Sequence, residues 1–387
     1  MWKNLLYKTR NLIKSKYHAY LIIVCTVTVV LNLLGCSKRF CELYKQYVYG
    51  YIASILGFIM SGVPVVLGEI LMYLGALLII ALVIILLLLM FIRRRAKYVA
   101  FVKKYVMVFV AIVCTVLLIY TITWIIPFRA PHLDVKPDIN KYYSVEELQI
   151  LRNYAATQLN SVAESIERDN NGRIVLSNDL RLDISDAMNH ISDDYPLLKG
   201  YYPRAKASYC SCFLEWMRIG GYTYPYTMEV SYNKYNNYLF TPVLWAHEQS
   251  HHKGYYQENE ATYLSILACI NSDSKYLQYA GYLEFYYYVA SDYNRSMLNV
   301  YDDDLAREII DEQPKLISLI QEDRADSHKK SKELYDQDIS PEFERIFREP
   351  AKEAGDSGWK AQGEIIGEAT YGGCVKYLLE YYDGILY

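Results

Sequence analysis

The sequence has no excess of charge of either sign. Its 387 residues carry 40 Lys and Arg against 43 Asp and Glu, for a net charge of −3. A nucleic-acid-binding surface needs a strong basic surplus, so we expect no nucleic-acid partner. The eight cysteines form no readable disulfide framework, and the chain contains no internal repeat or low-complexity tract. These absences exclude a disulfide scaffold and a repeat architecture.

Long apolar runs are present, and they are confined to the N-terminal third. Residues 20–34 and 105–127 form two of these runs, and residues 65–92 form a third that is interrupted only by Glu69. About 20 apolar residues suffice to cross a bilayer. We therefore predict a membrane region, residues 1–127, with three transmembrane helices in contact with lipid. Residues 47–62 are apolar enough to lie along the interface or to extend the second helix.

Basic residues predict how these helices are oriented. They gather before the first run and between the second and third runs, at Lys3, Lys8, Arg10, Lys14, Lys16, Arg93, Arg94, Arg95, Lys97, Lys103 and Lys104. Lys and Arg are enriched on the cytoplasmic side of membrane helices, so the N-terminus is expected in the cytoplasm. Three spans then place residues 128–387 outside the cytoplasm. We expect a multi-pass protein of the cell membrane with an extracytoplasmic C-terminal domain.

The C-terminal domain is expected to be mostly helical. A capping-box pattern at Ser144 and Glu147 opens a helix that runs to about residue 166, and residues 303–335 form a charged helical stretch. Residues 222–239 combine β-formers with turn residues and predict a small hairpin or edge strand. The predicted fold class is thus mainly α, with three transmembrane helices followed by a mostly helical extracytoplasmic domain that carries a small β hairpin or edge strand.

One short motif carries a specific chemistry. Three of the seven histidines lie in residues 247–252, which begin with HEQSH and match the zinc metallopeptidase pattern H-E-x-x-H. Residues four apart share one face of a helix, so His247 and His251 present two imidazole nitrogens to one Zn²⁺. Glu248 is rotated by about 100° from His247, to where a general base for an activated water is needed. His252 is off the ligand face and is expected at the surface or behind the ligands.

A catalytic zinc site also needs a third protein ligand and an open position for water. Glu258 and Glu260 are the candidates, because they open the helical run 258–269 that follows a short loop. They lie about 200° apart on that helix, so only one of them faces the metal. Glu260 shares its stripe with Leu264 and Leu267, which should pack against the zinc helix. We therefore predict Glu260 as the third ligand and keep Glu258 as the alternative.

Tyrosine is unusually abundant, with 41 residues. Tyrosine suits surfaces where the ring packs and the hydroxyl stays wet, and general packing is the simpler explanation of its abundance. A zinc peptidase often needs a hydrogen-bond donor to the oxyanion of the tetrahedral intermediate. Tyr279 and Tyr282, on the helix after Glu260, are the candidates for that catalytic role.

Residues 224–229 (YPYTME), 247–254 (HEQSHHKG) and 258–261 (ENEA) resemble the P-F-T-G-E-like, H-E-x-x-H and E-x-E-A-N motifs of a known protein family. The family is bacterial, is catalogued as a domain of unknown function, and combines N-terminal membrane helices with an H-E-x-x-H domain. The resemblance implies a gluzincin-like zinc metallopeptidase. Met228, where a glycine is usual, and Thr262, where an asparagine is usual, are departures that leave every proposed zinc ligand in place.

Together these patterns predict a membrane-anchored zinc-dependent metallopeptidase that hydrolyses peptide bonds of a peptide or protein substrate outside the cytoplasm. Two alternatives remain open. The first is a non-catalytic membrane sensor or scaffold with a zincin-like domain. The second is a zinc amidase that acts on cell-wall material.

Overall fold

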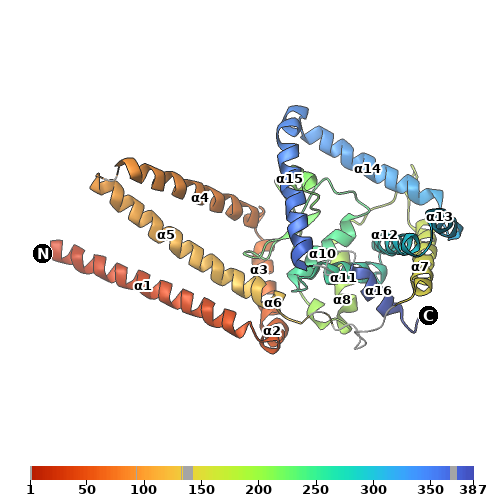
Figure 1. Cartoon of the computed structure of the whole chain (residues 1–387), viewed down its shortest axis with the longest axis horizontal. Helices are drawn as coiled ribbons and strands as arrows, with labels where there is room; N and C mark the ends of the chain where they lie inside the picture. The colour runs from red at the N-terminus through yellow and green to blue at the C-terminus, as the bar shows by residue number, and fades with distance from the viewer. Residues whose placement is uncertain (1, 93, 132, 134–142, 367–372) are drawn as a thin grey trace.

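The computed structural model describes residues 2–92, 94–131, 133, 143–366 and 373–387. Three helices lie apart from the rest of the molecule, and α5 lies between α1 and α4 and packs against both (Figure 1). They are α1 (Trp2–Leu34), α4 (Leu67–Ile92) and α5 (Ala96–Tyr120), and α5 continues through η2 (Thr121–Ile125) and α6 (Ile126–Phe128).

These helices confirm the predicted membrane spans. Lys16–Leu34, Leu67–Ile92 and Ala96–Phe128 are long and apolar enough to cross a membrane, and few of their side chains are buried by protein. The third span begins nine residues earlier than predicted, because the helix runs through Lys97, Lys103 and Lys104 instead of starting after them. Long lysine side chains near a helix end reach toward the lipid headgroups, so they are compatible with a span. The protein is therefore a membrane protein.

A short helical segment crosses between the spans and the domain. It consists of α2 (Lys38–Tyr44), a π-helical turn η1 (Lys45–Tyr49) and α3 (Gly50–Ser61). Helix α3 ends at Ser61, and a non-helical stretch that contains Pro64 leads to α4. A proline restricts the residue before it to extended backbone, and the segment 47–62 is consequently a separate element and not an extension of the second span.

The C-terminal domain is mainly helical, as predicted. Its elements are α7 (Val145–Ser165), α8 (Leu180–His190), η3 (Ile191–Asp193), η4 (Pro196–Leu198), β1 (Lys206–Ala207), α9 (Ser211–Trp216), β2 (Gly221–Thr223), β3 (Val230–Tyr232), α10 (Thr241–His252), α11 (Glu258–Ile270), α12 (Lys275–Val300), α13 (Asp303–Glu312), α14 (Ser318–Asp338), α15 (Pro341–Ile366) and α16 (Cys374–Tyr382). The predicted capping box is present, because Ser144 and Glu147 each accept a hydrogen bond from the other's backbone N–H.

The main core lies where α7, α10, α11, α12 and α16 pack together. The largest apolar side chains at its centre are fully buried, and they include Leu151, Leu159, Phe285 and Tyr293. The zinc-motif helix α10 packs on α11 and on the small sheet, so it is supported on two sides. This packing makes α10 a rigid platform for the side chains that it carries.

The predicted edge strand is also present. The sheet has the order β1-β3-β2, with β3 antiparallel to β2 and parallel to β1, so β2 is an edge strand beside α10. The turn between β2 and β3 holds Met228 with φ of 57°. This left-handed conformation favours glycine, the residue that the resembling family carries at this position.

Two buried carboxylates fasten the domain to the second span. Glu229 accepts hydrogen bonds from the backbone N–H groups of Leu67 (3.1 Å) and Gly68 (2.6 Å) at the start of α4. Glu69, one residue further along α4, accepts a hydrogen bond from the backbone N–H of Cys210 at 2.8 Å. A carboxylate at a helix N-terminus satisfies otherwise unpaired N–H groups and interacts favourably with the helix dipole. The domain is thus held to the second span by one carboxylate from each side, Glu229 of the domain and Glu69 of the span.

Candidate metal centre

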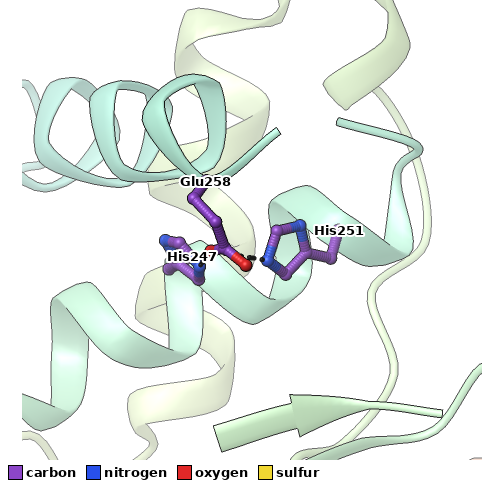
Figure 2. Close-up of side chains that lie close together, drawn as sticks. All are labelled: His247, His251 and Glu258. Atoms are coloured by element: carbon purple, nitrogen blue, oxygen red, sulfur yellow. Dashed lines mark hydrogen bonds and ion pairs between the residues drawn. The ribbon is translucent and has the colours of Figure 1, made fainter. Parts of the chain in front are cut away.

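The two motif histidines lie on one face of α10, as the spacing predicts. Gly254, with φ of 95°, ends the helix and turns the chain back, so that α11 begins at Glu258 directly across from them. The Nε2 atom of His247 lies 3.1 Å from Oε2 of Glu258, and the Nε2 atom of His251 lies 3.5 Å from the same oxygen. Figure 2 shows the three side chains converging on one point between α10 and α11.

The opposite nitrogens of the two rings are held by other groups. The Nδ1–H of His251 donates to the backbone oxygen of Tyr255 at 2.7 Å, and Nδ1 of His247 lies 3.2 Å from the hydroxyl of Thr262. Such contacts orient a metal-binding imidazole and select its tautomer. Both Nε2 atoms therefore point toward the shared position near Glu258.

The structure brings Glu258 to the histidine pair, whereas Glu260, the preferred third ligand from the sequence, lies elsewhere. Glu260 is buried, and its Oε1 accepts a hydrogen bond from the backbone N–H of Leu133 at 2.7 Å. Glu258 is the first residue of α11, and side chains on a helix lean toward its N-terminus. Its carboxylate consequently leans back toward the turn and the end of α10. Among the residues that the structure describes, His247, His251 and Glu258 are the only group of three potential metal ligands whose donor atoms lie within 4.8 Å of one another.

Charge at this cluster is strongly coupled. Burial alone lowers the pKa of His251, but the charges of Glu258 and Glu248 and the hydrogen bond to Glu258 outweigh it and raise this pKa to about 9. Burial alone raises the pKa of Glu258, yet the charges and hydrogen bonds of His251 and His247 hold it well below its usual range. The carboxylate of Glu258 is therefore ionised and available as an anionic ligand.

Glu248 lies on α10 beside the cluster but is not one of its three members. Its Oε2 accepts a hydrogen bond from the hydroxyl of Thr223 on β2 at 2.8 Å. Gly221, also on β2, comes so close that a Cβ atom there would lie 2.9 Å from Cγ and Oε1 of Glu248. Burial raises the pKa of Glu248, although the nearby histidine charges and Thr223 offset part of this shift. The edge strand thus orients the carboxylate that the motif assigns as a base.

Two cavities open on either side of Glu248. One, of about 480 Å³, is lined by His247, Glu248 and Tyr288 among others. The other, of about 390 Å³, is lined by His251, Glu248 and Glu258, and by Trp124 of the third span. Both include Gly221 of β2 in their walls. Each cavity thus exposes one of the two motif histidines together with Glu248.

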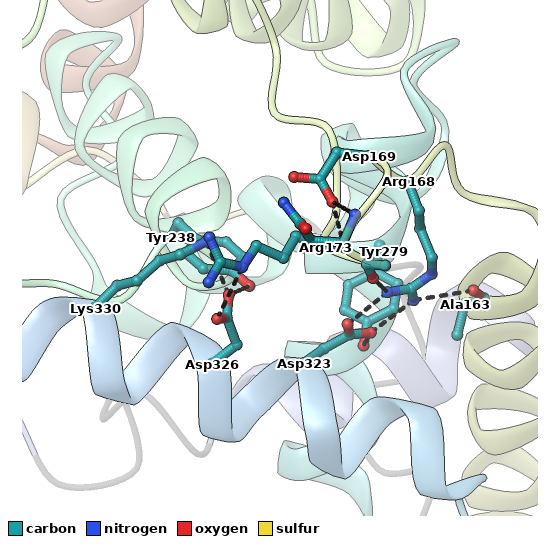
Figure 3. A network of polar contacts seen from close by, with 11 residues as sticks. Ala163, Arg168, Asp169, Arg173, Tyr238, Tyr279, Asp323, Asp326 and Lys330 are labelled. Atoms are coloured by element: carbon teal, nitrogen blue, oxygen red, sulfur yellow. Dashed lines mark hydrogen bonds and ion pairs between the residues drawn. The ribbon is translucent and has the colours of Figure 1, made fainter.

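The two tyrosines chosen from the sequence line neither of these cavities. The hydroxyl of Tyr279 donates to Oδ2 of Asp323 on α14 at 2.9 Å, and Asp323 also pairs with Arg168, as Figure 3 shows. Tyr282 packs on the aromatic ring of Phe285 in the core. Their nearness to Glu260 in sequence did not bring either side chain to these cavities, because one is bonded to Asp323 and the other packs on Phe285. The structure therefore does not place Tyr279 or Tyr282 at the cavities beside Glu248, where the predicted oxyanion donor would have to lie.

Tyr288 was missed by the sequence analysis, and it is better placed. It lies nine residues after Tyr279 and six after Tyr282 on α12, and it lines the same cavity as His247 and Glu248. Burial raises its pKa, and the nearby charges of Glu284 and Glu258 raise it further, so its hydroxyl stays protonated. Three consecutive tyrosines on a helix point in directions about 100° apart, and only the packing shows which of them faces the cavity. His252, expected at the surface or behind the ligands, is fully buried behind them, and its Nδ1–H donates to the backbone oxygen of Met228 at 3.1 Å.

Comparison with known proteins identifies a family but no function. No curated protein and no solved structure matches the chain. A family described as "Protein of unknown function (DUF3810)" matches residues 44–379. This range includes residues 47–62, the second and third spans, the edge strand and every residue of the candidate metal centre. Because the match covers most of the 387 residues, the chain belongs to the DUF3810 family.

Proposed function

We propose that the protein is a membrane-anchored, zinc-dependent peptidase. The observation that carries this proposal is the convergence of His247, His251 and Glu258 on one point, with the separate carboxylate of Glu248 beside it. Two imidazoles and one carboxylate are the protein ligands of a known class of catalytic zinc site. A purely structural zinc site uses four protein ligands and leaves no room for a substrate.

The distances between donor atoms support a tetrahedral ion. Bonds of about 2.05 Å to a tetrahedral zinc place neighbouring ligand atoms roughly 3.3 Å apart. The nitrogens of His247 and His251 lie 3.1 and 3.5 Å from the oxygen of Glu258. When bound, Zn²⁺ would supply a Lewis acid that polarises the scissile carbonyl and acidifies a water molecule. The two cavities that flank the cluster leave space for that water and for a substrate.

The remaining steps belong to the protein's own side chains. Glu248 takes a proton from the attacking water, whose oxygen forms a bond to the carbonyl carbon, and the proton passes to the amide nitrogen as the C–N bond breaks. Its raised pKa suits a group that must accept and then return a proton near neutral pH. Tyr288 is placed to donate a hydrogen bond to the developing oxyanion.

The edge strand favours a polypeptide substrate. β2 runs alongside α10 and presents the unpaired edge of the sheet to the cleft. An extended peptide adds to such an edge through main-chain hydrogen bonds that do not depend on its sequence. The cavities on the two sides of Glu248 would then hold side chains on either side of the cleaved bond. The basic loops of the membrane region support a location of this cleft outside the cytoplasm.

Substitution of Glu248 by Gln tests the proposal. The full chain, purified in detergent and loaded with zinc, is incubated with a mixed peptide library, and new N-termini are identified by mass spectrometry. We expect the wild type to cleave peptides, and E248Q to keep one equivalent of zinc while losing at least 100-fold in rate. Cleavage of peptidoglycan fragments but not of peptides would favour the amidase. Zinc well below one equivalent in the wild type, with no activity in either assay, would favour the scaffold.

A further inference from the structure

The candidate centre lies close to the membrane end of the domain. In Figure 1, α10 and α11 lie nearer to the membrane helices than α7 and α13, which lie on the far side of the domain. The ring of His251 stacks on Tyr256 at 6.3 Å, and Tyr256 contacts Trp124 at 4.2 Å, measured between ring centroids. The two steps together place His251 at most 10.5 Å from Trp124.

Trp124 itself marks the end of a membrane span. It lies four residues before the last residue of the span Ala96–Phe128, which is about 6 Å along a helix. Tryptophan is enriched where membrane spans meet the headgroups. The hydroxyl of Tyr256 also donates to the backbone oxygen of Thr123 at 2.6 Å. The loop that follows the zinc helix is therefore bonded directly to the end of the third span.

Helix α3 independently indicates that the candidate centre lies close to the membrane. Gly57 faces the zinc helix so closely that a Cβ atom there would lie 2.8 Å from Cε1 of His252. On the opposite face of α3, Tyr51, Ile55 and Phe58 are 72%, 60% and 68% exposed. An apolar stripe on a helix next to membrane spans indicates a helix that lies in the bilayer interface. Only the thickness of α3, about 10 Å, therefore separates the zinc helix from lipid.

The cleft is continuous with this membrane-facing surface. Trp124 lines the same cavity as Glu248, His251 and Glu258. The domain cannot swing freely away from the bilayer, because Glu229 and Glu69 bind both the domain and the start of the second span. The reacting groups are thus held near the level at which a membrane-anchored polypeptide leaves the lipid.

We infer that the substrate is a polypeptide anchored in the same membrane, cut within the first few residues beyond its own transmembrane segment. This inference rests on the proposed function and deepens it. An extended chain advances about 3.3 Å per residue, so a distance of at most 10.5 Å corresponds to about three residues. The chemistry is ordinary hydrolysis, with water as the co-reactant. Anchoring also raises the effective concentration of the cut segment at the cleft.

The test measures how far from the membrane segment an anchored substrate is cut. The zinc-loaded full chain is placed in liposomes with a pool of single-span polypeptides, each with 30 randomised residues on the side that carries the domain. The same randomised pool without the transmembrane segment is assayed at an equal total concentration. We expect cut sites to gather within about six residues of the membrane segment and the anchored pool to be cleaved at least 10-fold faster. E248Q should cleave neither pool.

A spacer series separates position from anchoring alone. One peptide sequence that the enzyme cuts is moved 3, 12 and 24 residues away from the membrane segment by a Gly/Ser spacer. The rate should fall at least 10-fold from the shortest to the longest spacer. Equal cleavage of all three, or of anchored and soluble pools, would overturn the inference while leaving the peptidase proposal intact. Absence of any Glu248-dependent cleavage would instead refute the peptidase proposal itself.

Discussion

The choice between Glu258 and Glu260 is open to a direct measurement. Substitution of Glu258 by Gln removes the negative charge whose oxygen lies 3.1 and 3.5 Å from the two histidine nitrogens. Loss of a residue that merely supports a metal ligand costs about 10- to 100-fold in affinity. A ligand itself should cost more than the upper end of that range, so we expect zinc to bind more than 100-fold more weakly. This corresponds to more than about 2.7 kcal/mol.

Glu260→Gln is the matched control, because it makes the same isosteric change two residues away on the same helix. The amide oxygen can still accept the hydrogen bond from the backbone N–H of Leu133, and the side chain is not part of the convergent group. We expect its zinc affinity to stay within about threefold of wild type, which is less than 0.7 kcal/mol.

The assay is competition between the full chain in detergent and a chelator of known zinc affinity, at fixed pH. The melting temperature without zinc is measured for both variants, so that a folding defect is recognised separately. Equal weakening by the two substitutions, or a larger effect of Glu260→Gln, would refute the assignment of Glu258 as a ligand. Unchanged affinity in both would refute the metal centre as a whole.

Three further outcomes are expected. Gly221→Ala would place a Cβ atom 2.9 Å from Glu248 and from the backbone oxygen of Ser231, so it should shift Glu248 and the edge strand against each other and lower kcat about 100-fold with zinc retained. Tyr288→Phe should lower kcat by a similar factor, whereas Tyr279→Phe should leave kcat unchanged but destabilise the fold by about 1.5–3 kcal/mol, because it removes a hydrogen bond to a carboxylate. Burial raises the pKa of Glu284 from 4.5 to about 7. The folded state then holds a proton that the unfolded state has lost, so stability should fall by up to about 3 kcal/mol as pH rises through this window, and Glu284→Gln should abolish that slope.

Control variants and contrary results can be named for these predictions. Gly50→Ala adds the same methyl group where nothing lies within 4 Å, and it should leave both kcat and zinc content unchanged. If Gly221→Ala behaves like Gly50→Ala, the close contact to Glu248 is of no catalytic consequence. A loss of kcat in Tyr279→Phe at full stability would restore the original assignment of that tyrosine. Identical melting curves of wild type and Glu284→Gln between pH 4.5 and pH 7 would show that the Glu284 carboxyl is solvated.

Local patterns were sufficient for much of the fold. The two zinc-motif histidines share a helical face because their spacing of four matches the helical repeat, which does not depend on the rest of the chain. The capping box at Ser144 and the edge strand before α10 likewise follow from interactions between near neighbours in sequence. The membrane spans follow from hydropathy, although the third begins earlier than its lysines indicated.

The third ligand shows where such reasoning stops. Helix α11 packs on α10, as the stripe of Leu264 and Leu267 predicts, but Glu260 on that stripe does not reach the histidine pair. The residue that does reach the pair, Glu258, is the first of its helix and leans back across the turn. Its position depends on where α11 starts and on the angle at which the turn at Gly254 delivers it. Neither quantity is encoded in the periodicity of the helix.

The sequence by itself determined the chemical types: a span-forming N-terminal third, a helix with two imidazoles on one face, an adjacent carboxylate, and a choice of two glutamates for a third ligand. Only the tertiary structure decided that Glu258 completes the group, that Tyr288 and not Tyr279 faces the cleft, and that the cleft reaches Trp124 at the membrane end. The reason is physical. Periodicity fixes angles within one helix, whereas the meeting of side chains from different helices is set by packing between segments that are distant in sequence.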